Sequence, residues 1–169
     1  MAEPWTTAAH RLFKKHNIRT VGYIPDAGLT ELIKSCHADN DIKSVVMTTE
    51  EEGIGLSSGA WLGGEKAAVL MQSSGVGNCI NQLSLIKHGQ FPFFTIITMR
   101  GEFGEGNPWQ FAMGEAVIPT LNSMGVNCIK IEKEEDVERT TKAALTMVFK
   151  SERSVAVLLS QKLIGAKVF

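Results

Sequence analysis

The sequence has few of the features that mark secreted, zinc-binding or nucleic-acid-binding proteins. Its three cysteines, Cys36, Cys79 and Cys128, are an odd number without a C-x-x-C pair, so neither a disulfide framework nor a zinc site is predicted. The four histidines are scattered without metal-ligand spacing. A net charge of −1 gives no general attraction to nucleic acid or to an anionic membrane. We therefore expect reduced core thiols, no nucleic-acid partner and no metal site within this chain.

Long apolar runs are lacking as well. No segment approaches the roughly 20 residues that a membrane-spanning helix needs. The first residues, Met1 to Trp5, do not have the basic-then-apolar pattern of a signal peptide, so we expect a cytoplasmic protein. A chain of 169 residues with 44% hydrophobic and 21% charged residues can bury one good core. Residues 1–169 are predicted to form a single domain.

The chain does contain a regular alternation of apolar runs and helical patterns. Most of the apolar runs are continuous, which is typical of parallel strands covered by helices on both faces. The predicted strands are 20–24, 44–47, 67–71, 93–99, 127–131 and 154–159, and the predicted helices are 6–15, 29–36, 53–62, 78–87, 111–124 and 135–150. Pro119 is expected to kink or divide its helix. The sequence thus predicts an α/β fold, doubly wound, with a six-stranded parallel sheet.

Three consecutive glutamates join the second predicted strand to a helix. Thr48 and Thr49 offer hydroxyls to cap that helix, and Thr49 and Glu52 have the spacing of a capping box. The helix dipole favours any carboxylate in the first turn, so a solvated, structural turn is one interpretation. Glu50 follows the carboxyl end of the strand, where ligands collect in open α/β sheets. A catalytic role for Glu50 is the alternative.

Glycines recur every four residues along the helix that follows. Gly55, Gly59 and Gly63 leave one stripe almost without side chains, although each glycine costs a helix about 1 kcal/mol relative to alanine. Such a stripe indicates that something approaches closely. Packing within the chain and contact with another subunit both remain open.

Three motifs resemble a known family in their sequence and order. They are Glu50-Glu51-Glu52-Gly53-Ile54-Gly55, Met71-Gln72-Ser73-Ser74-Gly75-Val76-Gly77-Asn78 and Arg100-Gly101-Glu102. Together they are similar to the pyrimidine-binding domain of thiamine-diphosphate-dependent 2-oxo acid decarboxylases. Within that class, the chain resembles the family of sulfopyruvate decarboxylase alpha subunits, with phosphonopyruvate decarboxylases as near relatives. The similarity runs from about Gly22 to Leu159.

The resemblance implies a role for several residues. Glu50, nine residues before Gly59, matches the catalytic acid that hydrogen-bonds the cofactor's pyrimidine ring. The implied cofactor-binding residues are Glu50, Gln72, Ser73, Gly75 and Asn78, and the implied substrate-binding residues are Pro25, Asp26, Ala27 and Arg100. The alternatives, in which these residues have only structural roles, are a tight turn at 72–78, a turn or N-cap residue at Asp26, and a surface arginine in a mobile loop at Arg100. Gln110 and Gly114 also look like family residues, without a defined role.

The resemblance also implies a reaction and a partner. The family's carboxy-lyases convert 3-sulfopyruvate to sulfoacetaldehyde and carbon dioxide, in coenzyme M biosynthesis or sulfonate metabolism. Gly104-Glu105-Gly106-Asn107 departs from the Gly-Asp-Gly motif that holds Mg²⁺ and the diphosphate. A beta subunit is therefore expected to hold the Mg²⁺ and the diphosphate of thiamine diphosphate, in an assembly of at least two alpha and two beta chains. A decarboxylase of phosphonopyruvate or another anionic 2-oxo acid, and a non-catalytic scaffold, remain as alternatives.

Overall fold

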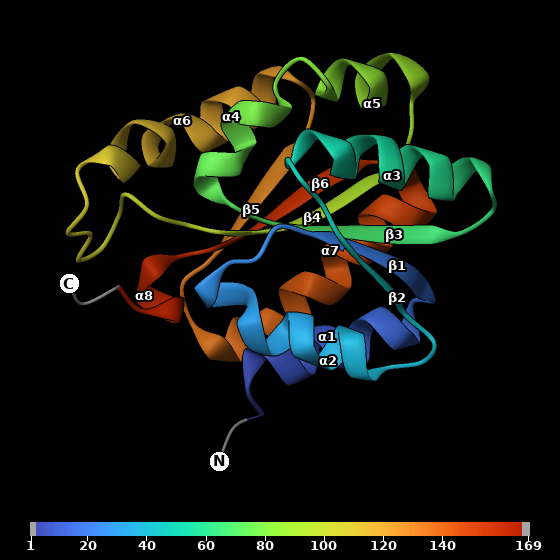
Figure 1. Ribbon diagram of the computed structural model, residues 1–169, viewed down its shortest axis with the longest axis horizontal. Coiled ribbons are helices and arrows are strands. Elements are labelled where there is room, and N and C mark those ends of the chain that lie inside the picture. Colours follow the sequence, from blue (N-terminus) through green and yellow to red (C-terminus); the bar gives the residue numbers. More distant parts are fainter. Residues whose placement is uncertain (1–2, 167–169) are drawn as a thin grey trace.

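A parallel sheet of six strands lies between two layers of helices (Figure 1). The computed structural model describes residues 3–166. The strands are β1 (Ile18–Tyr23), β2 (Lys43–Val46), β3 (Lys66–Gln72), β4 (Phe93–Thr98), β5 (Asn127–Ile131) and β6 (Ser154–Leu159). They lie in the order β2-β1-β3-β4-β6-β5, with every neighbouring pair parallel. The predicted fold class and all six predicted strands are confirmed.

Helices cover both faces of this sheet, as the sequence predicted. Figure 1 shows one layer formed by α1 (Trp5–Lys15), α2 (Thr30–Ala38) and α7 (Val137–Ser151). The opposite layer contains α3 (Glu51–Leu62), α4 (Val76–Cys79), α5 (Leu83–Gly89) and α6 (Trp109–Ser123). Shorter elements are the 3-10 turns η1 (Ala27–Leu29), η2 (Ser73–Gly75) and η3 (Glu134–Asp136), and helix α8 (Gln161–Ile164).

The central strands are apolar throughout because both of their faces are covered. All six residues of β4 are buried. On the α1 side, Phe13 packs edge-on against Phe94 of β4, with ring centroids 6.1 Å apart. Burial of each such side chain contributes roughly 1.5–3 kcal/mol. Cys36 and Cys79 are buried free thiols and Cys128 is partly buried, which confirms their interpretation as core residues.

Two helices differ from their predicted forms. The segment 78–87 contains no single helix: α4 ends at Cys79 and α5 begins at Leu83, with a turn at residues 80–82 between them. Of the two effects expected of Pro119, division of its helix is wrong, because α6 runs without a break from Trp109 to Ser123. Buried Val117 and Leu121 hold the helix on either side of the exposed proline, so packing outweighs the lost backbone hydrogen bond.

The start of α3 also differs from prediction. Glu50 occupies the N-cap position, and among the described residues no side chain caps the helix there. The predicted threonine cap is therefore wrong. Glu52 still has a structural role, because its Oε2 accepts the N–H of Thr48 at 2.8 Å. This bond ties the first turn of α3 back to the end of the preceding strand.

The glycines of α3 divide into two groups. A Cβ atom at Gly53 would lie 2.7 Å from Cγ1 of Val69, so this glycine allows the helix to approach β3. At Gly55 and Gly59, no described atom lies within 4 Å of where a Cβ would be. Packing within the chain therefore accounts for Gly53 and leaves the exposed stripe of Gly55 and Gly59 unexplained.

The strand order places a crevice at the carboxyl edge of the sheet. The chain passes from β1 outward to β2 and then returns to β3 on the other side of β1. Such a reversal is where ligands bind in open α/β sheets. Asp26, Glu50 and Arg100 follow β1, β2 and β4, and Gln72 ends β3. The fold thus gathers the predicted site residues along one edge.

Candidate active site

Glu50 is a buried carboxylate between two connections of the sheet. Its exposed fraction is 8%, whereas Glu51 and Glu52 are exposed. Oε2 of Glu50 accepts a hydrogen bond from Nδ2 of Asn78, on α4, at 2.9 Å. Glu50, which follows β2, is thus held by Asn78, which follows β3. Burial singles out Glu50 among the three glutamates.

Gly75 provides the space that Glu50 occupies. A Cβ atom at position 75 would overlap the carboxyl group of Glu50. The Cys79 thiol lies on the same side and donates to the Gly75 carbonyl at 3.4 Å. Burial raises the pKa of Cys79 to about 12, so this thiol stays neutral beside the carboxylate. The turn at 73–75 is consequently shaped around one acidic side chain.

Asp26 joins the ends of three strands. Its Oδ1 accepts from Nε2 of Gln72 at 2.7 Å. Its Oδ2 accepts from Oγ1 of Thr98 at 2.9 Å and from the Gly28 N–H at 3.0 Å. The last bond caps η1, so the prediction of a turn or N-cap residue is confirmed. The same side chain also connects β1 with β3 and β4.

Arg100 is buried in an ion pair that the sequence interpretation missed. Its exposed fraction is 6%, which makes the alternative of a surface arginine wrong. Nε and Nη2 contact Oε2 and Oε1 of Glu105 at 2.5 and 2.7 Å. The guanidinium holds the pKa of Glu105 well below its usual value, and Glu105 raises the pKa of Arg100. Two parallel bonds of this kind fix the plane of a guanidinium.

The main chain around Arg100 is closely packed. Ser73 is fully buried, and its Oγ accepts the Arg100 N–H at 3.1 Å. Gly101 has a φ of +72°, which favours glycine. A Cβ atom at Gly114 would overlap the Arg100 carbonyl, so this glycine lets α6 approach the loop. Packing thus explains Gly114, for which the sequence defined no role.

The predicted residues form two neighbouring groups. Glu50, Gly75 and Asn78 make the first. The second lines a cavity of about 160 Å³, whose walls are Asp26, Ala27, Gly28, Thr98, Arg100, Ile164, Gly165 and Ala166. Pro25 lines an adjoining cavity beside α2, together with Asp26 and Ala27.

The two groups are linked through the turn at 72–75, since Gln72 and Ser73 bond to the second group and Gly75 packs on Glu50. Sequence reasoning missed Thr98, Glu105 and Gln161. The available signal for Glu105 was an acid five residues after Arg100, which follows the end of β4.

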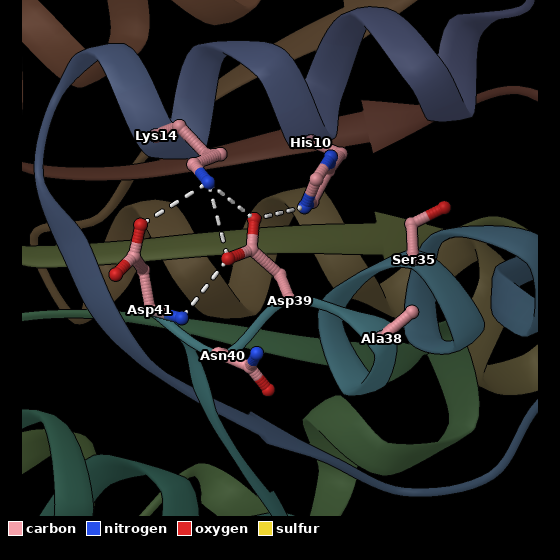
Figure 2. Close-up of a pocket in the computed structure, with 7 residues that line it drawn as sticks. All are labelled: His10, Lys14, Ser35, Ala38, Asp39, Asn40 and Asp41. Atoms are coloured by element: carbon pink, nitrogen blue, oxygen red, sulfur yellow. Dashed lines mark hydrogen bonds and ion pairs between the residues drawn. The ribbon is translucent and has the colours of Figure 1, made fainter.

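Another cavity, of about 570 Å³, lies at the other end of the sheet. Figure 2 shows His10 and Lys14 of α1 pointing toward Asp39, in the loop that leads into the amino end of β2. Asp39 Oδ2 lies 3.0 Å from His10 Nε2 and 2.9 Å from Lys14 Nζ. Lys14 lowers the pKa of Asp39. These contacts hold the loop against α1. We therefore interpret the cluster of His10, Lys14 and Asp39 as structural.

Within residues 3–166, no group of three or more histidine, cysteine, aspartate or glutamate side chains is placed to hold a metal ion. Over the same range, no helix has both the length and the hydrophobicity needed to cross a membrane.

The fold occurs in a larger enzyme of known structure. The chain superimposes with a TM-score of 0.77 on part of the 2-oxoglutarate:ferredoxin oxidoreductase from Magnetococcus marinus, at 17% identity, covering 96% of this chain and 29% of that one. No protein-family model matches the sequence. The fold and the strand order together define the class as an open, doubly wound α/β domain.

Relatives that match along about nine-tenths of their length show the family to which the chain belongs. The chain is 36% identical to the sulfopyruvate decarboxylase alpha subunit of Methanocaldococcus jannaschii, over 89% of this chain and 90% of that protein. It is 33% identical to the corresponding subunit of Methanococcus maripaludis, over 90% and 92%. A shorter match, 35% identical over 57% of this chain and 25% of the relative, is the phosphonopyruvate decarboxylase of Streptomyces viridochromogenes. The chain belongs to the family of sulfopyruvate decarboxylase alpha subunits.

The space for Glu50 is tested by comparing two nearby glycines. We expect Gly75→Ala to destabilise the protein by about 1–3 kcal/mol, because the new methyl group displaces a buried carboxyl group. At Gly77 a Cβ atom would lie 3.3 Å from Sδ of Met113, a flexible side chain. Gly77→Ala is therefore expected to be close to neutral. Urea unfolding of both variants measures the difference, and equal stabilities would contradict the described fit around Glu50.

Proposed function

We propose that this chain is the alpha subunit of a thiamine-diphosphate-dependent decarboxylase that converts 3-sulfopyruvate to sulfoacetaldehyde and carbon dioxide. The observation that carries the proposal is the buried Glu50, held by Asn78 and accommodated by Gly75, in a chain with full-length relatives in this family. An acid shielded from water is suited to a fixed hydrogen bond with a ring nitrogen of a cofactor.

Glu50 and its neighbours have the chemistry that a pyrimidine ring requires. Thiamine diphosphate, when bound, supplies a thiazolium ring that accepts the electron pair left as carbon dioxide departs. Glu50 would hydrogen-bond the pyrimidine, and Asn78 fixes the direction of the carboxyl group. Gly75 leaves the room that the Glu50 carboxyl group occupies. Gln72 and Ser73 hold this turn to Asp26 and Arg100, so they position the cofactor site against the substrate site.

The anionic 2-oxo acid is assigned to the cavity beside Arg100. Asp26, Ala27 and Arg100 line its wall, and Pro25 extends the surface next to it. Arg100 presents N–H donors to a sulfonate or a carboxylate. Asp26 is held rigidly by Gln72 and Thr98, which keeps a polar group near the reacting carbonyl.

The remaining half of the site is assigned to a beta subunit. The departure of Gly104-Glu105-Gly106-Asn107 from the Gly-Asp-Gly motif supports a partner that holds Mg²⁺ and the diphosphate. The names of the relatives as alpha subunits support a hetero-oligomer, for which we propose at least two alpha and two beta chains. We place this assembly in the cytoplasm, where its product enters coenzyme M biosynthesis or sulfonate metabolism.

The α3 to α6 layer has the surface that such a partner needs. Six large apolar side chains on or next to its helices are exposed: Leu62, Ile80, Leu85, Trp109, Phe111 and Ile118. Trp109 is 83% exposed and Leu62 is 74% exposed. The open stripe of Gly55 and Gly59 lies on α3 of the same layer (Figure 1). Exposed apolar groups of this size are typical of protein interfaces.

A second candidate substrate is phosphonopyruvate. The match to phosphonopyruvate decarboxylase favours it, because a phosphonate also suits an arginine and backbone donors. The match covers a quarter of that relative, whereas the alpha subunits match along about nine-tenths of their length. We therefore prefer 3-sulfopyruvate. A non-catalytic scaffold is disfavoured, because it has no use for a buried Glu50.

The proposed function is tested by carbon dioxide release from 3-sulfopyruvate, with thiamine diphosphate and Mg²⁺. We expect no turnover by this chain alone and turnover when the beta subunit is added, since the diphosphate half is supplied by the partner. Phosphonopyruvate is measured in parallel and is expected to react more slowly. Full activity from the chain alone would contradict the shared site, and faster turnover of phosphonopyruvate would reverse the choice of substrate.

The interface is tested by adding bulk to the open stripe. A Cβ atom at Gly59 would have no described atom of this chain within 4 Å, so the melting temperature of Gly59→Leu should stay within a few degrees of wild type, while its affinity for the beta subunit should fall at least tenfold. Ala143→Leu, at an exposed position of α7 on the opposite layer, is the matched control. Sedimentation or calorimetric titration measures the affinity, and equal binding by both variants would exclude the stripe from the interface.

A further inference from the structure

Glu105, whose carboxylate pairs with Arg100 beside the proposed substrate cavity, has a side chain that is 0% exposed. It belongs to the Gly104-Glu105-Gly106 segment, which matches no metal or phosphate motif. Gly104 has a φ of +72°, a conformation that glycine adopts without strain. Removing a carboxylate from water is costly unless it gains hydrogen bonds and a counter-charge. The contacts of Glu105 show what it gains.

Five donors converge on the two oxygens of Glu105. Oε2 accepts from Arg100 Nε at 2.5 Å, from Gln161 Nε2 at 3.0 Å and from the Gly101 N–H at 3.2 Å. Oε1 accepts from Arg100 Nη2 at 2.7 Å and from the Asn107 N–H at 2.9 Å. Gln161, on α8, also accepts the Glu102 N–H through Oε1 at 2.7 Å. The carboxylate is thus fixed from the loop and from α8 together.

This arrangement leaves one edge of Arg100 outside the pairing. Glu105 takes Nε and one N–H of Nη2, so Nη1 and the second N–H of Nη2 form the edge that is not used by this carboxylate. Arg100 lines the cavity that also contains Asp26 and Thr98. An arginine free to rotate would lose about 1.5–2 kcal/mol of side-chain entropy on binding an anion. A guanidinium that is already fixed avoids most of this cost.

Because nearby carboxylates balance the charge of Arg100, the orientation of its N–H donors matters more for binding an anion than the net charge of the cavity does. Arg100 is neutralised by Glu105, and the Asp26 carboxylate also acts on Arg100, raising its pKa further. The cavity therefore has no excess positive charge among the described side chains that line it. An anion bound there depends on directed N–H donors, whose strength falls steeply with misalignment.

We propose that Glu105 is a positioning residue that holds the outer edge of the Arg100 guanidinium toward the anionic tail of the substrate. The inference rests on the proposed function, because it takes the 2-oxo acid to bind beside Arg100. It adds a residue that acts through Arg100, and it makes Glu105 a determinant of selectivity for 2-oxo acids that carry a charged tail.

The test uses the assembled complex with Glu105→Gln and, separately, Glu105→Asp. Glutamine replaces one acceptor by a donor, and aspartate is one methylene too short to reach both nitrogens. Both variants are expected to raise the KM for 3-sulfopyruvate about tenfold or more, with kcat changed less than about threefold. Glu135→Gln is the matched control: Glu135 is an exposed acid of η3 that pairs with Lys133 at 3.7 Å, and its variant should retain the wild-type KM.

Selectivity separates positioning from general damage. Pyruvate, which has no anionic tail, is measured as a substrate or as a competitive inhibitor. We expect the preference for 3-sulfopyruvate over pyruvate to fall at least tenfold in both variants, whereas a merely loosened structure would weaken both ligands alike. The aspartate variant, which keeps the charge that neutralises Arg100, carries the comparison if the glutamine variant does not assemble.

The outcomes distinguish this inference from the proposed function. A wild-type complex that turns over 3-sulfopyruvate, with unchanged KM and selectivity in both Glu105 variants, would overturn the role of Glu105 alone. A wild-type complex that does not turn over 3-sulfopyruvate would overturn both the proposed function and this inference.

Discussion

A carboxylate taken out of water needs hydrogen-bond donors inside the protein, and this requirement organises the carboxyl edge of the sheet. Glu50 obtains a donor from Asn78, and Asp26 obtains three from Gln72, Thr98 and Gly28. The contacts with Asn78, Gln72 and Thr98 join segments that are far apart in the sequence. The ends of β1, β2, β3 and β4 are therefore held by the same side chains that the proposed reaction uses.

The glycines of this region follow from the same requirement. Gly75 leaves room for the Glu50 carboxyl group, and Gly114 lets α6 reach the Arg100 carbonyl. Alanine at either position would displace a buried polar group. By contrast, Gly55 and Gly59 face open space within this chain, which is consistent with a surface that another subunit covers. These glycines reduce the stability of their helices, and they lie where the site or a second subunit needs to approach the helix backbone closely.

Much of the fold was predictable because it depends on local pattern. Continuous apolar runs such as Val155 to Leu159 are buried on both sides, so the parallel sheet could be inferred from them. The break between α4 and α5 and the continuity of α6 through Pro119 depend on tertiary packing, which a single sequence does not display. The placement of Glu50 was predicted from its position after a strand and from the family resemblance.

The pairing of Arg100 with Glu105 was not predictable in the same way. A Gly-Glu-Gly segment is compatible with an exposed loop, and only the approach of Gln161 from α8 and the turn at Gly101 bury its acid. Spacing alone also could not separate Glu50 from Glu51. Burial does so, because Glu51 is exposed on the first turn of α3. The sequence can therefore suggest which residues after the strands belong to a site. The hydrogen bonds among those residues are known only from the folded chain.

The central claim is that the Glu50 carboxyl group takes part in the chemistry, and it is tested most directly by the turnover of a Glu50→Gln complex. The substitution keeps the shape of the side chain and removes its acid. We expect kcat for 3-sulfopyruvate to fall by about a hundredfold or more, with assembly unchanged and with the exposed Glu51→Gln variant close to wild type. Normal turnover by Glu50→Gln, together with an inactive Glu51→Gln, would contradict the assignment.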